Sequence, residues 1–140
     1  MSSNHEAAAL TVEQQHAAIL TVAEELLAAL RSNDAMSQVA VLRSRLGVLL
    51  SANLATEERE IIGPIRRLTV GNRPRLFTEL GQEATLLRSR YSEHVGKWNL
   101  RTIESAPAAY QRAAAELVKD LKAHVDRKRG VLAEWRSAAV

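Results

Sequence analysis

The chain has 140 residues, of which 46% are hydrophobic and only 4% aromatic, and it contains no cysteine. The lack of cysteine excludes disulfides, thiolate metal sites and thiol nucleophiles. Nineteen basic residues, mostly arginine, are interleaved with sixteen acidic ones and leave a net charge of +3. Scattered charge of this kind is typical of a solvated helical surface and does not favour a nucleic-acid partner.

The start of the chain, MSSNHEAAALTVEQQ, has neither the basic first residues nor the apolar centre of a signal peptide. No apolar run approaches the ~20 residues that a helix needs to span a bilayer. We therefore expect a cytoplasmic protein with no membrane contact. The length fits one domain, and the richness in Ala, Leu, Glu and Arg favours helices.

Four stretches with apolar residues at three- and four-residue spacing follow one another. The first opens at Thr11, which with Gln14 has the spacing of a capping box, and continues to Leu30. The second covers residues 39–61 and is expected to end at Gly63 and Pro64, a strong stop signal. The third covers residues 76–98 and the fourth residues 110–135.

Short links between four long helices predict an all-α fold, an up-down-up-down antiparallel four-helix bundle. The bundle is expected to occupy residues 11–136, between loose tails at residues 1–10 and 137–140. Each apolar stripe has an unexpected residue near its middle. In chain order these are His16, Asn53, Glu57, Ala84, Arg88, His124 and Lys128. Bundle cores build metal sites from inward histidines and carboxylates, and an unpartnered polar group would be costly there.

The run EQQHAAILTVAEELLAAL, with His16, resembles the first helix of the hemerythrin-like (HHE cation-binding) domain family. LLSANLATEEREIIGP resembles the second helix of that family, with its His-x-x-x-Glu-Glu pattern followed by proline. LGQEATLLRSRY resembles the third, which reads Glu-His and then Leu-Arg, and YQRAAAELVKDLKAHVDRKRGVLAEW resembles the fourth. The resemblance implies a hemerythrin-like bundle with metal-ligand positions at His16, Glu57 and His124.

Several positions depart from the family pattern. Asn53 and Ala84 replace histidines, Arg88 stands where some members have a further ligand, and the carboxylate of the last helix is replaced by Lys128 or Arg129, depending on register. A cationic side chain does not ligate a metal and repels it. The resemblance therefore implies a degenerate metal site that has lost the diiron centre and oxygen binding.

Two interpretations of the remaining site stay open. In the first, no cofactor is bound and Lys128, Arg129 or Arg88 neutralises Glu57; the protein is then a non-enzymatic regulatory or protein-interaction module without catalytic residues. In the second, His16, Glu57 and His124 hold a single iron or zinc ion, since two imidazoles and one carboxylate suit such a site, and the role is metal or oxygen sensing.

The partners expected from the sequence are an unknown protein and a second copy of the chain. A homodimer through one helical face is suggested by apolar residues beside the main stripes, such as Val22, Val41 and Ile65. A further class, recognition of an acidic ligand, nucleic acid or membrane surface, is suggested by the run DRKRG and by four arginines around the central loop. Those four are Arg66, Arg67, Arg73 and Arg75. Neutralisation of helix dipoles is the structural alternative for both basic groups.

Overall fold

The computed structural model describes residues 2–33 and 35–138, and their regular structure is helical. The elements are α1 (Ser2–Arg31), α2 (Met36–Glu57), a π-helical turn η1 (Glu58–Ile62), α3 (Gly63–Arg66), a 3₁₀ turn η2 (Val70–Asn72), α4 (Phe77–Lys97), α5 (Leu100–Ser105) and α6 (Pro107–Ala138). The all-α prediction is confirmed for these residues. Four long helices correspond to the four periodic stretches of the sequence.

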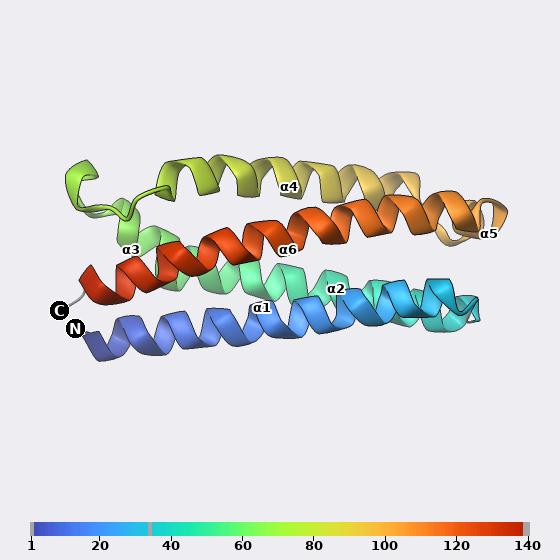
Figure 1. The fold of residues 1–140 in the computed structure, drawn as a ribbon, viewed down its shortest axis with the longest axis horizontal. Helices are drawn as coiled ribbons and strands as arrows, with labels where there is room; N and C mark the ends of the chain where they lie inside the picture. The colour runs from blue at the N-terminus through green and yellow to red at the C-terminus, as the bar shows by residue number, and fades with distance from the viewer. Residues whose placement is uncertain (1, 34, 139–140) are drawn as a thin grey trace.

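The four long helices lie side by side along the long axis of the molecule (Figure 1). Helix α1 packs against both α2 and α6, and α4 packs mainly against α6. The start of α1 and the end of α6 lie at the same end of the molecule, together with α3 and the loop that follows it (Figure 1). The short helix α5 lies at the opposite end, where the sequence indicated only a connection.

The predicted stop at Gly63 and Pro64 does not end the second helix. The helix widens into a π turn directly after Glu57 and then continues as α3. Proline has no N–H for the helical ladder and its ring crowds the carbonyl four residues earlier, so a wider turn accommodates it without a break. A Cβ at Gly63 would lie 2.9 Å from the carbonyl oxygen of Glu58, and the tight passage therefore also requires glycine.

The beginning of the chain differs from the prediction. Helix α1 begins at Ser2, and Ala8 and Ala9 are buried in the core, so this segment is not a loose tail. Thr11 lies inside the helix, and its hydroxyl donates to the carbonyl of Ala7 at 2.9 Å instead of capping a helix start. At the other end α6 extends to Ala138, and residues 139–140 lie outside the described residues.

The core consists of two hydrophobic clusters separated by a polar layer. The larger cluster fills the half of the molecule nearer α5 and includes Ile19, Leu42 and Tyr110. The smaller cluster lies near the chain ends and includes Val12, Ile65, Leu132 and Trp135. Between them lie the buried polar residues of the molecule's middle, which are His16, Asn53, Thr56, Glu57 and His124. Four of the unexpected residues of the stripes, His16, Asn53, Glu57 and His124, thus lie in one layer across the core.

Two apolar residues that were assigned to an outer face belong to this core. Val22 is buried in the larger cluster and Ile65 in the smaller, whereas Val41 is half exposed.

The stretch Met36–Arg66 is long and apolar enough to cross a membrane, by length and composition only. Core helices of soluble proteins meet the same criterion, and this stretch contributes Asn53 and Glu57 to the polar layer.

Candidate functional site

Glu57 is the centre of the polar layer. Its carboxylate lies 2.8 Å from Nε2 of His16 on α1, through Oε2, and 2.6 Å from Nζ of Lys128 on α6, through Oε1. The Glu57 side chain is 4% exposed and that of Lys128 18%. An ionised carboxylate only accepts hydrogen bonds, so the imidazole and the ammonium both donate. One side chain thus joins three helices through charge-assisted contacts.

The partners of Glu57 decide its ionisation state. Burial alone raises the pKa of this carboxyl, but the hydrogen bond from His16 and the charge and hydrogen bond of Lys128 outweigh burial and lower the pKa from 4.5 to about 2. Glu57 is therefore ionised at any physiological pH. A buried carboxylate of this kind is stable only while its partners remain in place.

Asn53 extends the layer toward α1. Its Nδ2 donates to Oε1 of Gln15 at 2.9 Å, and Nε2 of Gln15 donates to Oγ1 of Thr56 at the same distance. The Thr56 hydroxyl donates in turn to the carbonyl of Ala52, one turn earlier in α2. Asn53, which lies one turn before Glu57 on α2, is therefore hydrogen-bonded to the neighbouring helix α1.

His124 is paired with a carboxylate that the sequence reasoning missed. Its Nδ1 lies 2.7 Å from Oε1 of Glu83 on α4, and the same carboxylate accepts from Nε of Arg127 at 3.1 Å. Arg127 lowers the pKa of Glu83 most, with a further contribution from His124. Burial and the charge of Lys128 lower the pKa of His124, despite the opposing effect of Glu83. A neutral His124 that donates from Nδ1 has Nε2 as an acceptor, and this atom is buried without a hydrogen-bond partner among the described residues.

The other replaced ligand positions do not take part in the layer. Arg88 is exposed and donates to Oγ1 of Thr85 at 3.2 Å on its own helix. Arg129 is exposed and lies 3.6 Å from Asp126, one turn earlier. Ala84 is half-buried on α4. Of the three cations considered as partners of Glu57, Lys128 makes the contact.

The donor set does not suit a metal ion in this arrangement. His16 and His124 contact different carboxylates, and the ammonium of Lys128 binds directly to one oxygen of Glu57. Among the described residues, histidines and carboxylates form no group of three or more positioned to hold a metal. A cation bound at Glu57 would have to displace Lys128, which is itself the positive charge that this carboxylate requires.

No family model, curated protein or solved structure matches this chain. The likeness to hemerythrin-like domains therefore rests on the motifs of the sequence alone.

Three members of the site, Gln15, Thr56 and Glu83, escaped the sequence reasoning, although all three stand within the quoted motifs. Glu83 is the acidic residue directly before Ala84 in LGQEATLLRSRY, and Gln15 directly precedes His16. Each of these two is adjacent to a position on an apolar stripe and turned partly outward, so helical periodicity assigns it to the surface. The sequence signal that could have identified them is their residue type, because Glu and Gln side chains are polar and long enough to reach the layer from the edge of a stripe.

Proposed function

We propose that the protein is a degenerate hemerythrin-like domain, an up-down-up-down four-helix bundle whose centre is held by internal charge instead of by metal. The observation that carries the proposal is the ammonium of Lys128 on the carboxylate of Glu57, 2.6 Å away and opposite the imidazole of His16. The cation supplied by α6 takes the electrostatic role that bound metal has in such bundles. This agrees with the replacement of several family ligands in the sequence.

A centre of this kind supports a non-enzymatic role. Glu57 is ionised and both of its oxygens are engaged, so it is neither a proton donor nor an open ligand. His124 has its Nδ1 bound to Glu83, and the hydroxyl of Thr56 donates to the carbonyl of Ala52 on its own helix instead of to a base. The module then acts through its surfaces, as a regulatory or partner-binding bundle in the cytoplasm, and a homodimer is one form of such an interaction.

The second candidate is a mononuclear iron or zinc site that uses His16, Glu57 and His124. The observation in its favour is the state of His124, whose Nδ1 is fixed by Glu83 while Nε2 is a buried acceptor with no partner among the described residues. Metal-binding histidines are commonly oriented by a carboxylate in this way. This candidate requires Lys128 to leave Glu57, and the role would be metal or oxygen sensing.

Metal content separates the two candidates. The protein is purified without chelator from cells supplied with iron and zinc, and the metal per chain is measured by elemental analysis. We expect far less than one metal per chain, and no rise in the unfolding temperature when Fe(II) or Zn(II) is added. One equivalent of metal that disappears in a His124→Ala variant, but persists in an Arg88→Ala control, would establish the second candidate instead.

A further inference from the structure

The loop between α3 and α4 combines exposed aliphatic side chains with a cluster of arginines. It projects from the end of the molecule at which the chain begins and ends (Figure 1). Val70, in the turn η2, is 78% exposed and is the most exposed large hydrophobic residue of the described part of the chain. Leu76 and Leu68, on either side of the turn, are 49% and 37% exposed. Burial within this chain does not explain three aliphatic residues at such a tip.

The backbone of the loop is held in a costly conformation. Leu76 has φ 66°, in the left-handed region that residues with a side chain rarely adopt. The backbone N–H of the preceding residue, Arg75, donates to the carboxylate of Glu134 on α6, which anchors this side of the loop. The left-handed turn leaves the Leu76 side chain half exposed. Strain of this kind persists where the surrounding structure fixes it, and it is concentrated at functional sites.

Four arginines surround the aliphatic tip. Arg73 donates to the carbonyls of Leu68 and Arg66, at 3.3 and 3.0 Å, so it fixes the loop, and its charge has no carboxylate partner among the described residues. Arg67 and Arg75 are exposed, and their side chains form no ion pair with a described residue. Arg66 pairs with Glu58 at 2.9 Å. With Glu134 and Glu58 counted against the four arginines, the tip retains a clear excess of positive charge.

We propose that residues 66–76 form a docking surface for an anionic lipid bilayer. The aliphatic tip enters the boundary between headgroups and acyl chains, and the arginines bind the lipid phosphates around it. A single-stranded nucleic acid would stack its bases on aromatic side chains, and the loop has none. The charge of the surface and its protruding aliphatic side chains both fit the headgroup region of an acidic membrane. The inference replaces the expectation from the sequence that the protein has no membrane contact. It goes beyond the proposed function and does not depend on what occupies the polar layer.

Vesicle sedimentation tests the proposal with the intact chain. The probes are phosphatidylcholine vesicles, with and without about 30% phosphatidylserine, at about 0.1 M salt. We expect binding to the phosphatidylserine vesicles only, and a steep loss of binding at about 0.5 M salt. Each arginine near an anionic surface contributes roughly a fivefold gain in partition, so the double variant Arg67→Gln/Arg75→Gln should bind about 30-fold less. Val70→Ser should lose up to about tenfold.

Matched controls come from other exposed sites. Val48 on α2 is 66% exposed, and Arg101 and Arg112 are exposed arginines away from the loop. Val48→Ser and Arg101→Gln/Arg112→Gln remove the same groups and should leave vesicle binding unchanged. Circular dichroism and unfolding temperature verify that all four variants are folded, because none of these side chains is buried.

Three outcomes would overturn the proposal. The first is no binding to phosphatidylserine vesicles at low salt. The second is an equal loss in the loop variants and the controls, which would show that binding follows net charge and not the loop. The third is salt-sensitive retention on DNA without vesicle binding, which would assign the arginines to a nucleic acid. None of these outcomes bears on metal content, so failure here is distinguishable from failure of the metal-free centre.

Discussion

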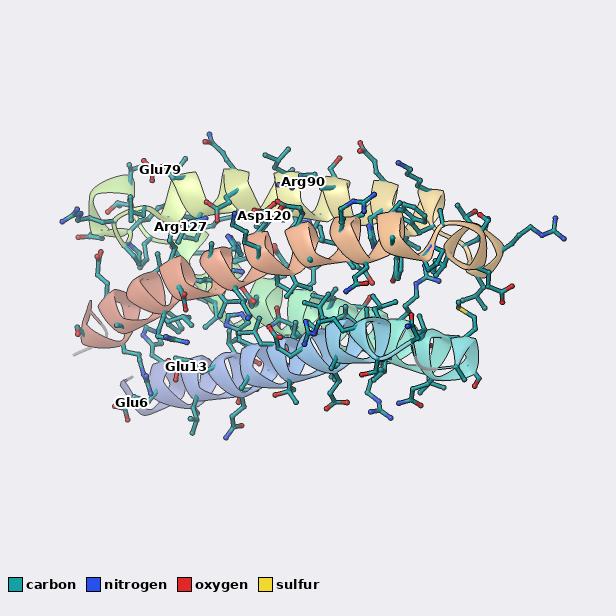
Figure 2. All side chains as sticks on the ribbon, turned by 45° about the vertical axis from the view of Figure 1, so that its right-hand side comes forward. Glu6, Glu13, Glu79, Arg90, Asp120 and Arg127 are labelled. Atoms are coloured by element: carbon teal, nitrogen blue, oxygen red, sulfur yellow. The ribbon has the colours of Figure 1, made fainter. Side chains whose placement is uncertain are left out.

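Two carboxylates in the molecule have the same kinds of partner but different surroundings. Glu57 contacts His16 and Lys128, and Glu83 contacts His124 and Arg127, so each joins one imidazole and one cation. The Glu57 side chain is 4% exposed, whereas that of Glu83 is 28% and that of Arg127 49%. Figure 2 shows Arg127 on α6 along the side that faces α4, near the surface pair formed by Arg90 and Asp120.

The difference in burial determines how much each cation contributes to the stability of the fold. Around Glu83 water screens the charges and can replace Arg127 as a partner. Around Glu57 no such replacement is available, and the loss of Lys128 leaves a buried carboxylate with a single hydrogen bond. The same chemical group is therefore a structural requirement in one half of the layer and a surface contact in the other.

The largest expected effect is that of Lys128→Met. The variant keeps most of the apolar stem but removes the charge that neutralises Glu57, and breaking a buried pair from one side costs about 3–5 kcal/mol. Urea unfolding near neutral pH measures the loss. Arg129→Met is the matched control, because Arg129 is exposed on the next residue of the same helix and should be nearly neutral.

A double variant sharpens this result. Glu57→Gln/Lys128→Met removes both charges, so it should recover much of the stability that Lys128→Met loses. Equal instability of the single and double variants would mean that the lysine acts by packing and not by charge, and the contrast between the two carboxylates would then fail.

The second effect appears on acidification. The pKa of Glu57 is depressed in the folded chain, from 4.5 to about 2, so the folded state binds this proton more weakly than the unfolded state does. The stabilisation is complete above about pH 4.5 and is lost as the pH falls toward 2. The shift corresponds to about 3 kcal/mol. The free energy of unfolding of the wild type should fall more across this window than that of Glu57→Gln/Lys128→Met, and parallel curves would contradict the assigned pKa.

The sequence predicted the helices well because their signals are local. Apolar spacing located all four long helices, and only the features that depend on neighbours were misplaced. The second helix continues past Gly63 and Pro64 because a π turn accommodates the proline. Helix α1 begins at Ser2 because Ala8 and Ala9 pack in one cluster with residues of α3 and α6, which are distant in the sequence. Tertiary packing thus outweighs a local start or stop signal in the sequence.

The site was only partly predictable, for a related reason. The polar residues on the stripes indicated the layer. Because a buried carboxylate requires a positive partner, the sequence also indicated that a cation neutralises Glu57. The choice between Lys128, Arg129 and Arg88 depends on the rotation of α6 and α4 relative to α2, which no local pattern encodes. Glu83 was missed because a long side chain at the edge of a stripe can turn inward to a partner that only the tertiary structure supplies.

The smallest expected effect is that of Arg127→Gln. Arg127 is half exposed, and Glu83 retains both water and Nδ1 of His124 after the change, so the unfolding midpoint should stay within experimental error of the wild type. The variant should nevertheless raise the pKa of Glu83 toward its ordinary value, because Arg127 is the main cause of its depression. An NMR titration of the Glu83 carboxyl detects that shift. A loss of stability as large as that of Lys128→Met would show that solvent does not screen the outer carboxylate, and exposure would then not explain the difference between the two.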